Sequence, residues 1–212
     1  CGGVQKLPAP VRGAGVSGSR LSDKARLPDQ RHLWQAIGTI VLSHESLFMS
    51  LRLILMRHAK SDWSQPGMND HARPLNPRGQ KAADVLGQWL RDRGYLPDLL
   101  LSSDATRTRD TFARLHLSCE TKFHRGLYLA PAVMMLQGLH RAGGARCVLM
   151  LGHNPGIADF AKALAMDPPQ DPDFQRYPTC ATTVFDFSGE SWQEVASGSG
   201  IIREFTVPRR LV

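Results

Sequence analysis

Short apolar runs alternate with amphipathic stretches over most of the chain. Runs rich in apolar and β-branched residues predict strands at 51–56, 99–101, 147–151, 182–187 and 192–195. Apolar residues spaced three or four positions apart predict helices at 77–92, 104–115, 131–141 and 155–166. Asp104 and Asn154 are the expected N-caps of two of these helices, and Gly94 is the expected C-terminal cap of the first. Strands that alternate with helices indicate an α/β fold, here a three-layer sandwich in which a mainly parallel sheet carries helices on both faces.

Residues 1–48 differ from the rest of the chain. They hold six Gly and three Pro among Ser, Arg and Lys, and they show no periodicity until about Leu33. The sequence begins with Cys1, and Met49 directly precedes the first predicted strand. We therefore expect 1–48 to be a disordered arm, or sequence read upstream of the real start, and 49–212 to form the folded domain.

Charge and composition limit the possible partners. A net charge of +7 fits either nucleic acid or a pocket that binds an anion, but the basic residues form no stripe interleaved with aromatic residues, so we expect no nucleic-acid partner. The apolar run 33–42 is interrupted twice and is shorter than the ~18 residues of a membrane helix, so we expect no membrane partner. The four cysteines are scattered without a Cys-x-x-Cys pair, which indicates neither a zinc site nor a disulfide framework and is typical of the reducing cytoplasm.

Basic residues follow three of the predicted strands. Arg57 and His58 come directly after the first strand, Arg107 comes shortly after the second, and His153 follows the strand at 147–151. The carboxyl ends of parallel strands meet at one edge of the sheet, which is where such folds bind ligands. Arginine donates paired hydrogen bonds to phosphate oxygens, so this edge is predicted to bind phosphate.

The two histidines extend the prediction from phosphate binding to catalysis. An unprotonated imidazole is a nucleophile towards phosphorus, and a second, protonated imidazole stabilises the oxygens of the transferred group. This chemistry requires positioning and positive charge but no metal. The sequence also lacks a Walker A loop and a His-Glu-x-x-His pair. We therefore expect a metal-independent phosphatase without a cofactor.

Three motifs, in this order, resemble those of the histidine phosphatase superfamily, whose fold is called phosphoglycerate-mutase-like. They are Arg-His at 57–58, Ser-Ser-Asp-Ala-Thr-Arg-Thr-Arg-Asp-Thr at 102–111 and Gly-His-Asn-Pro at 152–155. The resemblance covers about 49–212. Two further stretches are similar to the small SixA-type phosphohistidine phosphatases: Arg-Pro-Leu at 73–75 with Arg-Gly at 78–79, and Ala-Lys-Ser at 59–61 with Trp63.

The resemblance implies a role for each candidate residue. His58 would be the nucleophile, and His153 would be the second histidine of the pocket. Arg57, Arg73 and Arg107 would bind the phosphate. The implied catalytic set is therefore His58, His153, Arg57 and Arg107. Arg73 also fits a surface position before a turn fixed by Pro74, and that alternative stays open.

The sequence departs from the family pattern in two places. Ala59 stands where most members have Gly after the Arg-His pair. Larger members carry an acidic proton donor in an inserted segment, but the corresponding stretch 125–128, Arg-Gly-Leu-Tyr, has no carboxylate. Asp62 is the only carboxylate near the first motif, and it equally fits a loop cap. A mutase activity is therefore disfavoured, and the identity of any general acid stays open.

Three functions remain. The first is dephosphorylation of protein phosphohistidine through a phosphohistidine intermediate on His58, because a shallow pocket without insertions admits a side chain presented by another protein. The second is a small-molecule phosphomonoesterase at the same site. The third is a non-catalytic module that binds phosphate or phosphoproteins, against which the presence of both His58 and His153 argues. The expected partner is a phosphorylated protein or small molecule, and the sequence does not indicate the oligomeric state.

Overall fold

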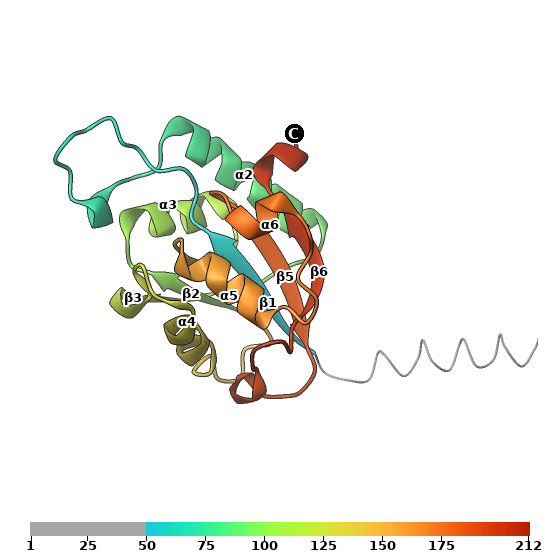
Figure 1. The fold of residues 1–212 in the computed structure, drawn as a ribbon. Coiled ribbons are helices and arrows are strands. Elements are labelled where there is room, and N and C mark those ends of the chain that lie inside the picture. Colours follow the sequence, from blue (N-terminus) through green and yellow to red (C-terminus); the bar gives the residue numbers. More distant parts are fainter. Residues whose placement is uncertain (1–49) are drawn as a thin grey trace, which may run out of the picture. The chain divides into compact units, whose positions relative to one another are not determined.

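The computed structural model describes residues 50–212, which form a six-stranded sheet between two layers of helices (Figure 1). The expected arm at 1–48 lies outside the described residues. The strand order is β3-β2-β4-β1-β5-β6. The strands are β1 (Leu51–Arg57), β2 (Leu99–Ser103), β3 (Glu120–His124), β4 (Cys147–Gly152), β5 (Thr182–Phe187) and β6 (Ile201–Thr206). The helices are α2 (Pro77–Asp92), α3 (Thr106–Leu115), α4 (Ala132–Leu139), α5 (Gly156–Leu164) and α6 (Pro172–Arg176).

The direction of the strands brings the predicted site residues to one edge of the sheet. β1 pairs in parallel with β4, and β4, β2 and β3 continue the parallel arrangement. β5 runs antiparallel to β1, and β6 runs antiparallel to β5. The predicted α/β fold with a mainly parallel sheet is therefore confirmed.

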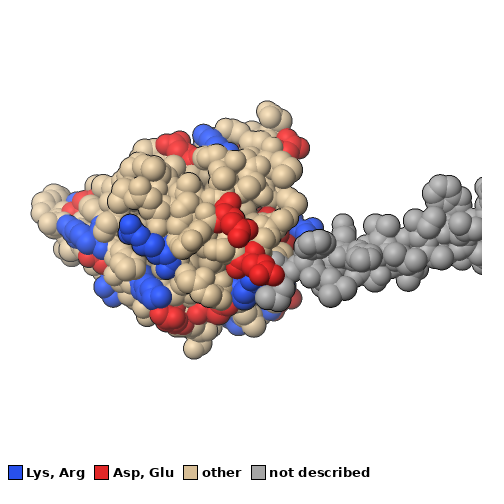
Figure 2. All heavy atoms as spheres, turned by 90° about the horizontal axis from the view of Figure 1, so that it is seen from below, with Lys and Arg blue, Asp and Glu red and all other residues tan. Residues whose placement is uncertain are grey.

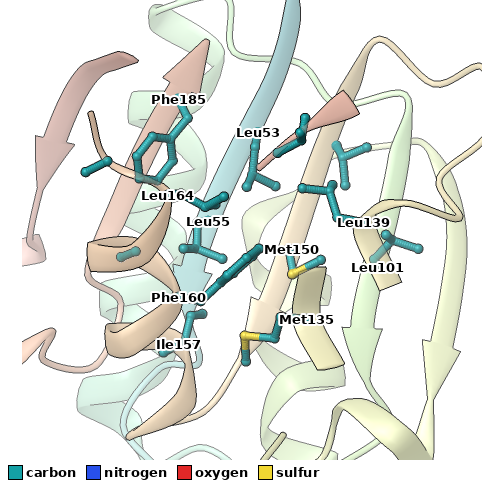
Figure 3. Close-up of a cluster of buried hydrophobic side chains, with 14 of the residues drawn as sticks. Leu53, Leu55, Leu101, Met135, Leu139, Met150, Ile157, Phe160, Leu164 and Phe185 are labelled. Atoms are coloured by element: carbon teal, nitrogen blue, oxygen red, sulfur yellow. The ribbon is translucent and has the colours of Figure 1, made fainter. Parts of the chain in front are cut away.

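Alternation of side chains along β1 explains the two helical layers. Leu53 and Leu55 belong to a core cluster under α4 and α5, whereas Ile54 and Met56 belong to a cluster under α2 and α3. Figure 3 shows the first cluster, with side chains of β1, β2, β4 and β5 directed towards those of α4 and α5. Because both faces of the sheet are covered, its central strands are apolar throughout, which explains why they were predictable.

The strand predicted at 192–195 is wrong. Trp192–Glu194 is a turn of 3-10 helix, in which the Ser191 hydroxyl accepts a hydrogen bond from the Gln193 N–H. Burial of Trp192, whose indole donates to the Ala145 carbonyl, is what gave this segment a strand-like pattern. The last strand is instead β6. The sequence also gave no indication of β3, a polar strand at the sheet edge.

The predicted helix N-caps Asp104 and Asn154 are wrong. Ala105 and not Asp104 is the N-cap of α3, and Pro155 and not Asn154 is the N-cap of α5. The Asp104 carboxylate lies 2.6 Å from Nε2 of His71, in the loop between β1 and α2. The Asn154 amide donates to the carbonyls of Arg176 and Tyr177. Both side chains therefore hold loops at the carboxyl edge of the sheet instead of capping helices.

The surface of the described part carries both kinds of charge. On the face seen in Figure 2, Lys and Arg side chains are interspersed with Asp and Glu side chains. None of the helices within 50–212 is long and apolar enough to cross a membrane.

Candidate active site

A cavity of about 240 Å³ lies at the carboxyl ends of β1 and β4 and is lined by Arg57, His58, Arg107 and His153. Arg57 ends β1, His58 directly follows it, and His153 directly follows β4. Arg107 lies in the first turn of α3, which follows β2. The parallel strands thus bring four of the five predicted site residues together.

His58 is held in one orientation and one tautomer. Its backbone N–H donates to the carbonyl of Gly152 at 3.1 Å. Its Nδ1 lies 2.7 Å from the carbonyl of Ala59, which can only accept a hydrogen bond, so Nδ1 carries the proton and Nε2 the free lone pair. Burial lowers the pKa of His58 to about 3, and the nearby guanidinium groups act in the same direction. At neutral pH the side chain is an uncharged imidazole, the form that attacks phosphorus.

His153 faces His58, and its ring has no hydrogen-bond partner among residues 50–212. The two ring centroids are 5.0 Å apart. Both ring nitrogens of His153 are buried, and neither has a partner within the described part of the chain. Burial, followed by the proximity of His58 and Arg107, lowers the pKa of His153 to about 2. An unpartnered buried imidazole is costly in free energy, and an anion in the cavity would offset that cost.

Arg57 and Arg107 supply the positive charge of the cavity. Arg57 donates from Nη1 to the carbonyl of Tyr177 at 2.9 Å. Its buried Nε has no partner among the described residues. Burial, followed by the charge of Arg107, lowers the pKa of Arg57. Arg107 donates to the backbone carbonyl of Asp70 and, at 3.0 Å, to its carboxylate. The buried Arg107 and the half-buried Arg57 together form an anion site.

Asp70 is a carboxylate of this cavity that the sequence analysis missed. It lies in a turn of 3-10 helix, Asp70–Ala72, within the loop between β1 and α2. Its carboxylate accepts hydrogen bonds from Arg107 and, at 2.6 Å, from the hydroxyl of Tyr128. The Tyr128 hydrogen bond, followed by the charge of Arg107, lowers the pKa of Asp70, so this group is ionised at neutral pH.

The position of Asp70 could not be found from its sequence neighbours. Tyr128 belongs to the stretch at 125–128 that lacks a carboxylate of its own, and the acid reaches it from a loop far away in the sequence. The nearest indication is that Asp70 precedes the Arg73-Pro74-Leu75 motif by three residues. Asp62, the acid considered from the sequence, does not line the cavity and caps a turn through the backbone N–H of Ser64.

The structure does not bring Arg73 into the lining of the cavity. Its guanidinium is buried and donates to the carbonyls of Met68 at 3.1 Å and Asp62 at 3.3 Å. It also lies 4.0 Å from the ring centroid of Trp63. These contacts place Arg73 at the centre of the loop that carries Trp63 and Asp70 to the cavity.

Small residues allow the segment after β1 to pack closely. A Cβ atom on Gly79 would lie 2.1 Å from the carbonyl oxygen of Lys60, so only glycine fits where α2 crosses this segment. Ala59 is fully buried, and its N–H donates to the hydroxyl of Thr111 at 3.0 Å. The methyl group at the position where most family members have Gly is thus accommodated beside α3.

Comparison with known proteins identifies the family. The model of the histidine phosphatase superfamily (branch 1) matches residues 53–127. An uncharacterised protein of Mycobacterium tuberculosis is 33% identical over 160 residues, which cover 73% of this chain and 100% of that protein. The chain belongs to the histidine phosphatase superfamily. An uncharacterised chloroplastic protein of Arabidopsis thaliana is 29% identical over 169 residues, covering 73% of this chain and 75% of that protein.

Solved structures show which members of the histidine phosphatase superfamily are similar. A Nakamurella multipartitia protein assigned as the phosphohistidine phosphatase SixA is 28% identical, with a TM-score of 0.67 over 75% of this chain and 96% of that chain. An Agrobacterium tumefaciens protein with the same assignment is 26% identical, with a TM-score of 0.61 over 74% and 98%. The protein histidine phosphatase SixA complexed with tungstate, 19% identical, has the same fold, with a TM-score of 0.62 over 76% and 100%. This histidine phosphatase therefore falls in the small SixA-type branch, which supports a phosphatase activity.

The remaining candidate groups are possible metal ligands and cysteine thiols. Within residues 50–212, no cluster of three or more His, Cys, Asp or Glu side chains is arranged to hold a metal ion. Cys119, Cys147 and Cys180 are free thiols.

Proposed function

We propose that this histidine phosphatase hydrolyses phosphohistidine on proteins through a phosphohistidine intermediate on His58. The observation that carries the proposal is the state of His58, a buried, neutral imidazole whose Nδ1 is bound to the carbonyl of Ala59. Its Nε2 lone pair shares a cavity with two arginines and with His153, whose ring nitrogens have no partner in the described part of the chain. The free thiols of the described residues support a place in the cytoplasm.

The first step transfers the phosphoryl group to His58. Arg57 and Arg107 bind the phosphoryl oxygens, and Arg107 shares its donors between the phosphate and Asp70. The Nε2 lone pair attacks phosphorus, a phosphorus–nitrogen bond forms, and the bond to the leaving group breaks with its electron pair on the leaving group. A water molecule then attacks the phosphorus. The phosphorus–nitrogen bond breaks, its electron pair returns to Nε2, and inorganic phosphate leaves.

His153 acts as an electrostatic partner in both steps. It is neutral in the unliganded cavity because burial and its cationic neighbours disfavour the imidazolium form. A phosphoryl dianion reverses that balance, so binding of substrate is coupled to proton uptake by His153. The resulting imidazolium donates to an equatorial oxygen and stabilises its charge in the transition state.

The ionised state of Asp70 supports a particular substrate class. Asp70 is ionised and accepts hydrogen bonds, so it is a poor proton donor at neutral pH. Alkyl phosphates need a proton on the departing oxygen, and loss of a general acid costs about 10²–10⁴-fold in rate. The ring of phosphohistidine leaves as neutral imidazole when its other nitrogen already carries a proton, and acidic phenols leave as stable anions, so neither needs a proton from Asp70. The site therefore favours phosphohistidine and aryl phosphates over phosphoserine and sugar phosphates.

The deciding experiment combines a substrate panel with trapping of the intermediate. Purified protein is assayed with a phosphohistidine peptide, a phosphoserine peptide, sugar phosphates and a series of substituted phenyl phosphates. We expect the first and last classes to be hydrolysed fastest, with a steep dependence on the acidity of the phenol. Rapid quench with labelled substrate is expected to yield an acid-labile, alkali-stable phosphoenzyme.

Two variants test whether the labelled intermediate forms on His58. His58→Ala is expected to lose the labelled intermediate, and His116→Asn, a surface substitution, is expected to keep it. Label that persists in His58→Ala would place the nucleophile elsewhere. Efficient hydrolysis of alkyl phosphates with no dependence on the phenol would instead identify a small-molecule phosphomonoesterase with a proton donor. Binding of phosphate without turnover of any substrate would identify a non-catalytic module.

A further inference from the structure

A second cavity, of about 320 Å³, lies on the α4 side of the sheet, between β3 and α4. Its floor is formed by the buried side chains of Leu101 and Leu127. Its walls carry Lys122 from β3, Arg125 from the turn that follows β3, and Arg141 beyond the end of α4. We call this cavity the basic groove.

The basic groove has more positive charge than its neighbours neutralise. None of the described residues that line it is an Asp or Glu. Lys122 forms an ion pair with Glu120 at 3.0 Å, and Arg125 lies 3.8 Å from Asp104 with most of its side chain exposed. Arg141 forms no ion pair with any residue that the structure describes. The charge of Arg141, unpaired within the described residues, with two solvent-accessible cations beside it above an apolar floor, fits a ligand that carries both carboxylates and apolar groups.

The basic groove adjoins the catalytic cavity. Residues 125–128 separate the two, and the guanidinium carbon of Arg125 lies 5.1 Å from the ring centroid of Tyr128. The same ring also contacts residues of the catalytic cavity: its centroid is 5.3 Å from that of His153, and its hydroxyl donates to Asp70. A chain bound in the basic groove therefore passes within a few residues of the catalytic histidines.

Exposed apolar side chains mark the rim between the two cavities. Leu129 lines the catalytic cavity and is 51% exposed, and Met134 lines the basic groove and is 42% exposed. Leu129 has a φ of +50°, a conformation that a branched residue adopts at a cost and that tends to occur at functional sites. Exposed apolar side chains beside the two cavities offer packing surface to apolar residues of a bound chain.

The strand beside the basic groove can accept an extended chain. β3 is the last strand on its side of the sheet, and no described residue pairs with its outer edge. A peptide that adds to such an edge gains backbone hydrogen bonds and places alternate side chains towards neighbouring pockets. Among the residues that the structure describes, no Phe, Tyr or Trp lines the groove for stacking of bases, so a protein segment fits better than single-stranded nucleic acid.

We propose that the basic groove binds an extended segment of the phosphorylated protein substrate, rich in Asp or Glu with interspersed apolar residues, which flanks the residue that enters the catalytic cavity. The entry of a phosphorylated residue into the catalytic cavity rests on the proposed function, whereas the binding of the flanking segment in the basic groove does not. Small phosphorylated molecules reach the catalytic histidines without filling the groove. The groove thus selects protein substrates by the charge around their phosphorylated residue.

The kinetic test uses charge reversal in the basic groove. The probes are a phosphohistidine peptide flanked by alternating Glu and Leu, the same peptide with Gln in place of Glu, and an aryl phosphate. Arg141→Glu is expected to raise the KM for the Glu-flanked peptide by about tenfold, while the other two substrates stay within about twofold. Lys81→Glu, on α2 in the opposite helical layer, is the matched control and is expected to change none of the three. Unchanged turnover of the aryl phosphate shows that each variant is folded.

Two kinetic outcomes would overturn the inference. One is an equal KM of the unmodified protein for the Glu-flanked and Gln-flanked peptides. The other is an equal change for all three substrates in Arg141→Glu, because this would place the effect of Arg141 in the catalytic cavity.

A binding test separates this inference from the proposed function. Calorimetry measures the affinity of the unphosphorylated Glu-Leu peptide for the unmodified protein, for His58→Ala and for Arg141→Glu. Binding is expected in the first two, weakening as salt increases, and is expected to be lost in the third. Absence of binding, or tighter binding of a single-stranded oligonucleotide than of the peptide, overturns the inference and leaves the phosphatase proposal intact. Binding of the unphosphorylated peptide without hydrolysis of any phosphohistidine peptide overturns the phosphatase proposal and leaves this inference intact.

Discussion

The histidine pair owes its chemistry to burial. His58 and His153 directly follow two neighbouring strands, β1 and β4, and each has cationic neighbours that disfavour a proton on its ring. The sequence identifies both residues through their motifs. Their protonation state depends on desolvation and on the guanidinium groups around them, which only the folded chain specifies.

We predict that this pair makes the unliganded protein lose stability as the pH falls. In the unfolded chain each imidazole has a pKa of about 6.5, whereas the folded pKa values are about 3 for His58 and about 2 for His153. Between these limits the unfolded state binds more protons, so acidification lowers the free energy of unfolding by up to about 1.4 kcal/mol per pH unit for each histidine. Both contributions are at their most favourable above pH ~6.5 and are lost progressively below it.

Urea unfolding at pH 7, 6 and 5 measures this dependence. His153→Asn is expected to reduce the slope of stability against pH, and the surface variant His116→Asn is expected to keep the slope of the unmodified protein. Equal slopes for the unmodified protein and His153→Asn would show that the folded His153 titrates normally.

At the scale of elements, the loop between β1 and α2 completes the cavity. Trp63 and Asp70 reach the cavity from this loop. Arg73 binds its backbone carbonyls and stacks against Trp63, and the His71 side chain joins it to Asp104 next to α3. Backbone hydrogen bonds from Asp62 to Pro74 and from Asn76 to Lys60 close the base of the loop, and the side-chain contacts hold the part between them.

We predict that Arg73 acts on the substrate through this loop. Arg73→Ala is expected to increase backbone hydrogen exchange over 61–72 and to weaken phosphate binding by no more than about threefold. Arg107→Ala is expected to reduce the rate of phosphorylation by about 10²-fold or more, the scale of one lost oxyanion donor. Arg73→Lys is expected to recover part of the loop protection, because it restores the charge but not the planar set of donors.

Exchange mass spectrometry and single-turnover kinetics on the same variants provide the comparison. A loss of phosphorylation rate in Arg73→Ala equal to that in Arg107→Ala, with exchange over 61–72 unchanged, would mean that Arg73 binds the phosphate directly.

On the scale of the whole molecule, the sheet brings distant motifs together. The strands β1, β2 and β4 are neighbours with the same direction, although about forty residues separate consecutive ones in the sequence. Their carboxyl ends therefore deliver Arg57, Arg107 and His153 to one place. β1 lies between β4 and β5, so the first element of the described chain is indispensable to the sheet.

We predict that residues 49–212 fold and function without residues 1–48. The M. tuberculosis relative matches 73% of this chain over its whole length, so about a quarter of this chain has no counterpart there. Deletion of 1–48 is expected to leave the thermal midpoint within about 3 °C and the turnover of an aryl phosphate within about twofold. Calorimetry and steady-state kinetics on the two proteins measure this. A shorter protein that does not fold would place part of 1–48 in the core.

The sequence by itself determined the elements that are apolar or carry a motif. The central strands and α2 were predicted because burial on both faces of a sheet, or on one face of a helix, leaves a regular pattern of apolar residues. The polar edge strand β3 and the 3-10 turn at Trp192 were not predicted correctly, since an exposed edge has no such pattern and a single buried Trp resembles one. Four site residues were predicted because their motifs follow strand ends.

The tertiary structure decided which groups these four residues meet. Asp70 reaches Tyr128 and Arg107 because the loop after β1 folds back over the strand ends, and Arg73 turns into that loop instead of the cavity. The basic groove exists because α4 and β3 lie side by side in the fold. Such contacts join residues far apart in the sequence, and their energies depend on distance and burial in the folded molecule, which no local pattern of residues encodes.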